Sequence, residues 1–492
     1  MISLWLEAQD VREHIYIPKY YDPGIQSDLE ALASTHRCIS VGQLIMQKTL
    51  SVSTGDEIGK AAYGTGDIPF VRTSDIANWE IKAVPKQGVS QEIFEEYAAK
   101  QDVQAGDILL VRDGTYLIGT NCFITYADKE LLYQSHILKF RVRDQQQLAP
   151  EILFLLLNAP IVQRQIRSFQ FTADIIDTIG QRINELVLPI PLDAEWQNRL
   201  IYETKEALAV RVKGKAFIKQ CPSLVEQVLE TGNLDAINSF FYIPVEELAE
   251  VLTTDTVTAE FGGFEYSWEA ASSIIDNIYL PKYYDPTITD ELEQLAPFCD
   301  LISLGDLKEQ GVITYYTGDE IGKAAYGTGD IPFIRTSDFS NWEIKHDPKQ
   351  GISEEIYEEY ASKQNVKEND ILLVRDGTYL VGSSCIVTEH DAKSLYCGGL
   401  YKITTNNFDI FTPHLLLGLM NSFIVKRQIR TKQFTRDVID TIGNRLDEVT
   451  LPIPKSAEVK RVLDEVISGA IKERIEARML ISKLSRTITL GK

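Results

Sequence analysis

One internal repeat constrains the fold of this chain more than any other feature. The segment Ile15–Pro23, IYIPKYYDP, returns as IYLPKYYDP at Ile278–Pro286. The same offset of 263 residues relates Arg72 to Arg335, and no net insertion or deletion separates the copies. The chain is therefore expected to contain one fold twice, a first copy and a second copy.

Similarity within the repeat is uneven. Three blocks are nearly identical, namely 54–82, 107–119 and 164–180, which match 317–345, 370–382 and 427–443. Two stretches have drifted, namely 24–53 against 287–316 and 120–149 against 383–412. This distribution predicts a shared framework that carries different inserts.

Polar and apolar patterns predict a mixed fold, with strands at 67–72, 107–112 and 137–142 and helices at 92–100 and 150–166. The first two strands are apolar runs bounded by Gly and Asp, which indicates burial, with turns at Gly66 and Gly114. The third alternates like a half-buried strand. Pro160 predicts that the second helix is one helix or a broken pair.

Long helical periodicity follows each copy, directly after the sequence LPIP at 188–191 and 451–454. Apolar residues recur mostly at steps of three and four over 194–219 and 459–480. These stripes fit ordinary amphipathic faces within a domain, but their position favours spacer helices that pack on each other.

Net charge is the feature that most limits the possible partners. The chain has 492 residues, and its formal net charge is −22. No Lys or Arg lies between Lys219 and Lys282, where eleven acidic residues fall. Nucleic-acid binders normally neutralise phosphates with basic residues. DNA binding by this chain must therefore depend on a few well-positioned basic side chains or on a partner.

Cysteine and histidine spacing gives no sign of a metal or cofactor. The six cysteines form no CxxC pair and the six histidines no ligand spacing, so buried thiols in a reducing cytoplasm are expected. There is no apolar run long enough to span a membrane, and residues 1–13 lack a signal-peptide pattern. The expectation is a cytoplasmic protein with no membrane partner.

An ordered set of motifs resembles the specificity subunits of type I restriction-modification systems. It comprises GDIPFVRTSD at 66–75, GDILLVRDG at 106–114 and LPIP at 188–191, each repeated 263 residues later with Asn369 in place of Gly106. The resemblance implies an α+β fold, with two mixed α/β target-recognition domains separated by long antiparallel helices. Family members usually carry two dissimilar domains, so both ordinary type I restriction and a related phage-defence system stay open.

The resulting domain prediction has five parts: target-recognition domain 1 at 1–191, spacer helix 1 at 192–220, an acidic linker or insert at 221–277, target-recognition domain 2 at 278–454, and spacer helix 2 at 455–492.

The resemblance also implies a non-catalytic subunit that reads a bipartite double-stranded DNA target. It would direct DNA adenine methyltransferase subunits and, as a further partner, a motor-nuclease. No Asn/Asp-Pro-Pro-Tyr/Phe turn of an adenine methyltransferase is present. Gly55–Ala61 suggests a phosphate-binding loop but is one residue short, and Ala61 stands where the loop needs Ser or Thr.

Repeated cations and hydroxyls in the nearly identical blocks are the candidate phosphate contacts. They are Lys60, Arg72, Thr73, Ser74, Arg112, Thr115, Tyr116, Arg164 and Arg167, with Lys323, Arg335, Thr336, Ser337, Arg375, Thr378, Tyr379, Arg427 and Arg430. The alternative for each arginine is an ion pair with a neighbouring carboxylate, such as Asp75 or Asp113.

Base reading is expected where the copies differ. Gln134, Ser135 and His136 stand against Cys397-Gly398-Gly399, and Tyr401 and Lys402 are further candidates. Neutral drift in exposed loops is the alternative. Because so much else is identical, two similar half-sites, even a nearly palindromic target, are predicted.

Two other functions stay open. An anti-restriction decoy would use its acidic surface to imitate DNA, and would bind no DNA even with methyltransferase present. A protein–protein scaffold derived from a specificity subunit would tolerate charge reversal at Arg72 and Arg335.

Overall fold

The computed structural model describes residues 11, 15–114, 116–128, 130–173, 176–240, 242–243, 248, 274, 278–377, 379–436 and 439–490. The chain divides into two compact units, each with its own copy of the repeat. Unit 1 comprises 1–214, 245–254 and 473–492, and unit 2 comprises 215–244 and 255–472. Most of the predicted acidic segment beyond residue 243 lies outside the described residues.

The first copy contains a four-stranded antiparallel sheet at its centre, in the order β2-β10-β7-β8. These strands are β2 (Leu50–Thr54), β7 (Ile108–Val111), β8 (Asn121–Phe123) and β10 (Ile137–Val142). Smaller sheets surround it, formed by β1 (His36–Ser40) with β13 (Val187–Pro191), β3 (Ile68–Val71) with β6 (Gly88–Val89) and β9 (Leu132–Tyr133), β4 (Ile76–Ala77) with β5 (Glu80–Ile81), and β11 (Phe171–Ala173) with β12 (Ile176–Thr178).

The helices of the first copy are α1 (Pro23–Leu32), α2 (Val41–Met46), α3 (Gln91–Gln101), α4 (Pro150–Leu157) and α5 (Pro160–Phe169). Short 3₁₀ segments are η2 (Pro18–Tyr21), η3 (Lys60–Ala62), η4 (Thr73–Asp75) and η5 (Gly180–Glu185). Of the two possibilities for 150–166, the structure has the broken pair, because Pro160 begins α5.

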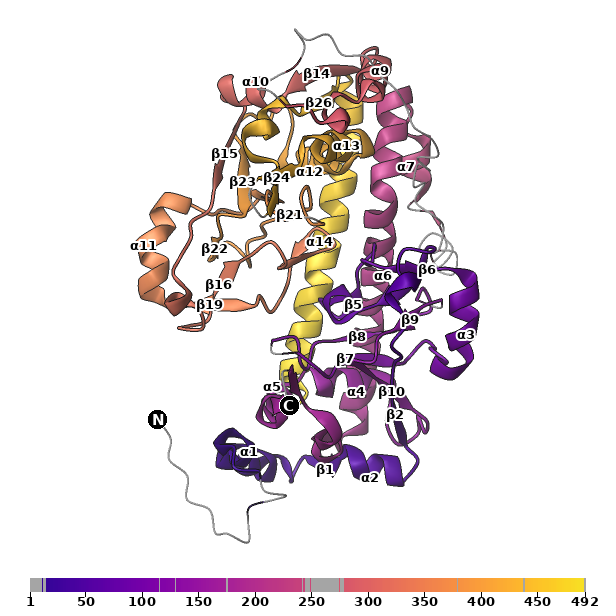
Figure 1. The fold of residues 1–492 in the computed structure, drawn as a ribbon. Coiled ribbons are helices and arrows are strands. Elements are labelled where there is room, and N and C mark those ends of the chain that lie inside the picture. The colour runs from indigo at the N-terminus through magenta and orange to yellow at the C-terminus, as the bar shows by residue number, and fades with distance from the viewer. Residues whose placement is uncertain are drawn as a thin grey trace. The chain divides into compact units, whose positions relative to one another are not determined.

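The second copy repeats this topology (Figure 1). Its strands are β14 (Cys299–Ser303), β15 (Ile313–Thr317), β16 (Ile331–Ile334), β17 (Phe339–Ser340), β18 (Glu343–Ile344), β19 (Gln350–Ile352), β20 (Ile371–Val374), β21 (Ser384–Ile386), β22 (Leu395–Tyr396), β23 (Leu400–Thr405), β24 (Phe434–Arg436), β25 (Ile439–Thr441) and β26 (Thr450–Pro454). Its helices are α9 (Pro286–Leu295), α10 (Leu304–Glu309), α11 (Glu354–Gln364), α12 (Pro413–Asn421) and α13 (Phe423–Lys432), with 3₁₀ segments η8 (Pro281–Tyr284), η9 (Lys323–Ala325) and η10 (Gly443–Glu448).

A buried helix forms the middle of the first copy's core. All eight residues of α4 are buried, because the helix is almost wholly apolar and packs among the sheet, β13 and α5. Burying a Leu or Phe side chain contributes about 1.5–3 kcal/mol, so this helix is a major source of stability for the fold.

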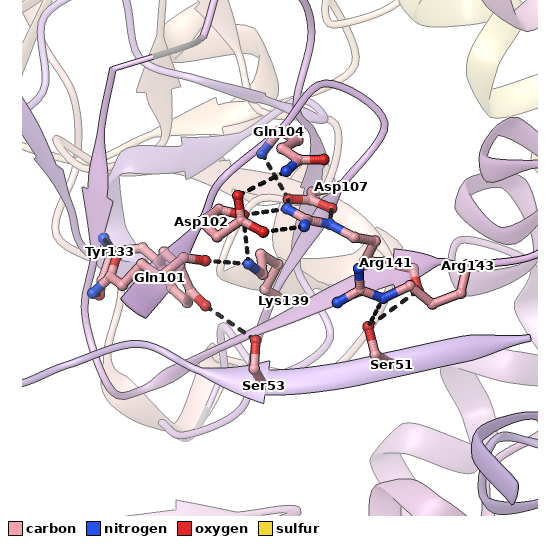
Figure 2. A network of polar contacts seen from close by, with 10 residues as sticks. All are labelled: Ser51, Ser53, Gln101, Asp102, Gln104, Asp107, Tyr133, Lys139, Arg141 and Arg143. Atoms are coloured by element: carbon pink, nitrogen blue, oxygen red, sulfur yellow. Dashed lines mark hydrogen bonds and ion pairs between the residues drawn. The ribbon is translucent and has the colours of Figure 1, made fainter. Parts of the chain in front are cut away.

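The expectation that 137–142 is half-buried is wrong. Every residue of β10 is buried, including Lys139 and Arg141, whose charged groups are satisfied internally (Figure 2). The Nε and Nη2 atoms of Arg141 each lie 2.6 Å from a carboxylate oxygen of Asp107, and its Nη1 lies 2.5 Å from Asp102. Lys139 donates to the carbonyls of Gln101 and, at 2.8 Å, Asp102.

Two long helices follow the copies, α6 (Ala194–Thr231) and α14 (Ala457–Thr487). Each has residues in both units. The predicted end of the first spacer at residue 220 comes too early, because α6 continues through Pro222. A further short helix, α7 (Asp235–Phe240), follows it.

Within unit 1, the start of α6 runs antiparallel to the end of α14. Near the start of α6, the His36 ring contacts Trp196 and its Nε2 lies 2.8 Å from the carbonyl of Ile488. Further along, Arg211 and Arg474 each donate to the other's backbone carbonyl at 3.2 Å. The paired helices predicted from periodicity are thus present in unit 1.

Candidate nucleic-acid interface

In the first copy, the three nearly identical blocks meet at the loop that follows β7. Backbone hydrogen bonds join this loop to 134–136 and to β12: Arg112 N to His136 O (2.9 Å), Ile179 N to Arg112 O (3.3 Å) and Gly114 N to Asp177 O (2.8 Å). Another, from Gln134 N to Val71 O (3.0 Å), brings the same segment beside Arg72. The residues thus gathered form what we call the convergent surface: Arg72, Arg112, Asp113, 134–136 and Thr178.

The second copy gathers the equivalent residues in the same way. The bonds run from Arg375 N to Gly399 O (2.9 Å), Ile442 N to Arg375 O (3.1 Å), Gly377 N to Asp440 O (2.8 Å) and Cys397 N to Ile334 O (3.0 Å). Its convergent surface comprises Arg335, Arg375, Asp376, 397–399 and Thr441. In both copies, the drifted tripeptide therefore lies among residues that did not drift.

Arg112 and Asp113 form an ion pair at the centre of the first convergent surface. The Arg112 guanidinium donates to Asp113 from Nε (3.0 Å) and Nη2 (2.7 Å). Burial by itself would raise the pKa of Asp113, but hydrogen bonds from Arg112, Thr178 and His136 outweigh it and lower that pKa. The expected alternative of a local ion pair holds for Arg112, and equally for Arg375 with Asp376 (3.1 Å).

Arg72 has a different environment from Arg112. Asp75 accepts the backbone N–H of Arg72 (3.0 Å), and the guanidinium lies over the Tyr63 ring, 5.9 Å from its centroid. The Arg72 Nε is buried without a hydrogen-bond partner among the described residues. The neighbouring hydroxyls differ in exposure, since Thr73 is half-buried and Ser74 is exposed.

Lys60 lies in an exposed loop that is identical in the two copies from Gly55 to Ile68. Lys60 and Lys323 are exposed, and within the described part of the chain neither forms an ion pair. Buried residues stay identical because they pack, but packing gives no reason to retain an exposed lysine. The loop begins at Gly55, where a Cβ would lie 2.2 Å from the carbonyl oxygen of Tyr133.

Arg164 and Arg427 serve the fold. Arg164 binds Asp22 (2.7 Å) and Asp28 (2.8 Å), which tie α5 to α1 and its N-cap. Arg427 binds Glu291 (2.5 Å) and the Thr287 hydroxyl (2.6 Å) on α9. These contacts favour the ion-pair alternative for both arginines over a phosphate contact.

Arg167 and Arg430 each bind the backbone of the loop that contains Tyr116 or Tyr379. Their Nη2 atoms donate to the carbonyls of Tyr116 (3.3 Å) and Tyr379 (3.0 Å). The side chains of these tyrosines are 44 % and 67 % exposed. The other predicted members of this loop, Thr115 and Thr378, lie outside the described residues.

Two of the predicted base-reading residues are buried and are withdrawn. Tyr401 is 5 % exposed and its hydroxyl donates to the carbonyl of Gly443 (3.0 Å). Lys402 is 7 % exposed and binds Asp370 (3.0 Å). Both lie on β23, whose two faces are covered, so neither reaches a DNA groove. Gln134, Ser135 and His136 are half-buried and remain candidates.

Sequence reasoning missed three participants in this region. Thr178 donates to Asp113 (2.5 Å), and Glu57 accepts from Ser135. The Arg182 guanidinium lies 3.6 Å from the centroid of the Phe171 ring, as Arg445 does over Phe434 (3.7 Å). All three are identical in both copies, which was the available signal.

Among the residues that the structure describes, no cluster of His, Cys, Asp or Glu could hold a metal ion. Four of the six cysteines are buried as expected, whereas Cys38 is exposed and Cys397 is half-buried. None of the described helices is both long enough and apolar enough to cross a membrane.

Structural comparison finds chains of low sequence identity. One is the S subunit of a type I restriction-modification system from M. genitalium, with 11 % identity, 92 % of this chain and 94 % of that chain covered, and a TM-score of 0.35. Another is the HsdS subunit from Thermoanaerobacter tengcongensis, with 13 % identity, 92 % and 95 % covered, and a TM-score of 0.26. A third comes from a study of complex assembly and conformational transition of the type I R-M system, with 14 % identity, 92 % and 98 % covered, and a TM-score of 0.26.

Sequence comparison identifies the domain. No curated protein matches the chain significantly. Residues 47–204 match the family model for the type I restriction modification DNA specificity domain, which confirms the resemblance found in the motifs. The matched stretch includes the whole first convergent surface, and the sequence repeats it 263 residues later. Over residues 47–204, this chain is therefore similar to the type I restriction modification DNA specificity domain family.

Proposed function

We propose that this chain is the DNA-reading subunit of a type I restriction-modification complex or a related phage-defence complex. Each copy reads one half-site of a bipartite duplex target, and the long helices set the spacing between half-sites. The two half-sites are similar. The chain carries no catalytic step and directs partner adenine methyltransferase subunits, with a motor-nuclease as a further partner.

The observation that carries this proposal is the identical exposed loop that contains Lys60 and Lys323. Two copies that drift elsewhere retain the same exposed cation, in a loop whose Glu57 accepts a hydrogen bond from Ser135 in the first copy. An exposed lysine at this position would bind a DNA phosphate whatever the base sequence. Two recognition domains that read different bases both need such a contact. The drifted tripeptide beside it is free to differ between half-sites.

Charge reversal at the loop lysines tests the proposal. K323E in the full chain, purified with its partners, should weaken duplex binding by about tenfold at moderate salt. Because one phosphate contact is lost, the slope of log K against log salt should fall by about 1. K60E/K323E should change the slope by about twice as much.

K367E is the matched control, because it makes the same charge change in the second copy. Lys367 is exposed at the start of β20, at the opposite end of that strand from Arg375, and Gln104 replaces it in the first copy. K367E should leave the salt slope unchanged. An equal effect of K323E and K367E would indicate a general charge effect and contradict the proposed surface.

A further inference from the structure

The two convergent surfaces differ in how fully their central carboxylate is engaged. In the first copy, Asp113 accepts from Arg112, from His136 Nδ1 (2.8 Å) and from Thr178 (2.5 Å). The Asp113 side chain is only 9 % exposed. Its hydrogen-bonding capacity is therefore used inside the domain.

The equivalent carboxylate in the second copy is more open. Gly399 replaces His136, and among the described residues Asp376 accepts a side-chain hydrogen bond only from Arg375 Nε (3.1 Å). The Asp376 side chain is 27 % exposed. Arg375 has one further bond, a long one of 3.4 Å to the carbonyl of Gly398. Donor and acceptor groups of this pair thus remain available.

We propose that the tripeptide 134–136, with its counterpart 397–399, decides which base pair each copy reads by engaging or freeing the carboxylate of the neighbouring Arg–Asp pair. This inference rests on the proposed function. In the second copy, the half-buried Arg375 and Asp376 suit a G·C pair, because Arg donates to guanine and Asp accepts from the cytosine amino group. In the first copy, His136 engages the carboxylate of the corresponding pair, and Gln134 offers the side-chain amide that suits adenine.

The structure allows the tripeptides to be exchanged. Neither Gly398 nor Gly399 has a positive φ, so side chains are compatible with the backbone. A Cβ at 398 would lie 2.8 Å from Glu320 Oε1, which is the end of a flexible side chain. In the first copy, the equivalent Glu57 accommodates Ser135 by accepting its hydrogen bond and lies 3.7 Å from His136 Nε2.

Binding-site selection from a random duplex library tests the inference, using the full chain purified with its partners. The wild-type target should contain two half-sites that differ at one base pair, with G·C on the second copy's side. Q134C/S135G/H136G should convert the first half-site into the second and give a palindromic target. C397Q/G398S/G399H should give the opposite palindrome.

M46E is the control, because it also replaces a first-copy residue by its counterpart, Glu309. Met46 is 77 % exposed at the end of α2, before β2 begins, and β2 leads away from it towards the convergent surface. M46E should leave the target unchanged, and circular dichroism should show all variants folded.

The inference is overturned if wild-type half-sites are identical, if an A·T pair occupies the differing position on the second copy's side, or if the exchanges leave the target unchanged. Loss of all binding by folded exchange variants also overturns it, because each tripeptide already serves one copy. If the wild-type complex itself selects no sequence, the proposed function has failed instead.

Discussion

At the scale of single residues, a comparison of corresponding positions in the two copies shows which residues change together. The buried Arg141 forms an ion pair with the exposed Asp102 in the first copy, whereas Thr404 and Asn365 occupy these positions in the second. Asp107 and its counterpart Asp370 are retained, and Thr404 donates to Asp370 (2.5 Å). At these two positions the second copy has neutral groups in place of one positive and one negative charge. The net charge of the two positions is therefore the same in both copies.

R141T is therefore expected to destabilise the first copy by about 3 kcal/mol, because it removes the guanidinium that pairs with the buried carboxylate of Asp107. R141T/D102N should recover part of that loss, since it recreates the combination found in the second copy. A double-mutant cycle on the free energy of unfolding would give the coupling between the two positions. Additive effects of R141T and D102N would contradict this interpretation.

Residue identity between the copies identified the region of the site but not the role of each residue. Arg164 and Arg427 are retained because they bind carboxylates on α1 and α9, which identity alone does not reveal. Tyr401, which differs from its counterpart Leu138, and Lys402, which is matched by Lys139, were both predicted to read bases, yet both side chains are buried. Those outcomes depend on both faces of β23 being covered, and that is a tertiary property.

At the scale of elements, one buried glutamate ties the long helices to the first copy. Glu80 on β5 lies 3.0 Å from Arg211 on α6 and 2.6 Å from Arg474 on α14. All three residues are buried, and the two arginines are related by the repeat offset. Gly214 allows this approach, because a Cβ there would lie 2.4 Å from Arg474 Cγ.

E80Q should destabilise unit 1 by about 3 kcal/mol or more, because it removes a buried carboxylate charge that two buried guanidinium groups share. E203Q is the control, since Glu203 pairs with Arg199 on the exposed side of α6 and should contribute less than about 0.5 kcal/mol. Thermal unfolding measured by calorimetry distinguishes them. Equal shifts in Tm would show that the Glu80 cluster does not stabilise the fold.

Another element contact predicts a pH dependence. Glu226 on α6 accepts from the backbone N–H of Ile424 at the start of α13 (3.5 Å), and burial raises the pKa of this carboxyl to about 7. Because the folded state holds the proton more tightly, the stabilisation is complete below about pH 4.5 and is lost as the pH rises through 7.

E226Q removes this titration. Relative to wild type, the variant should become more stable as the pH rises from 5 to 8, by about 1 kcal/mol after allowance for partial exposure. The measurement is Tm of both proteins at several pH values between 5 and 8. Parallel Tm profiles would contradict the assignment.

The elements themselves were largely predictable, because apolar periodicity and Pro160 identify β3, β7, α3, α4 and α5. Two errors have physical causes. Lys139 and Arg141 made β10 resemble a half-exposed strand, although their charges are paired inside the domain. The change in composition after Lys219 predicted a helix end, whereas α6 continues through Pro222. The meeting of three blocks at Arg112 depends on strand pairing between distant segments, which no local pattern reveals.

At the scale of the whole molecule, the net charge of −22 means that the chain as a whole repels DNA. Binding by a few exposed cations in each copy is therefore expected to be weak and strongly dependent on salt. Partner subunits that add their own contacts to DNA would offset this repulsion. We therefore expect this chain to select the target sequence and its partners to contribute part of the binding affinity.

Methylome sequencing of the native host, with and without the gene for this chain, tests the central claim most directly. We predict methylated adenines at one bipartite sequence with two similar half-sites at a fixed spacing. This methylation should be lost completely when the chain is absent. Unchanged methylation in its absence, or methylated sites without two related half-sites, would contradict it.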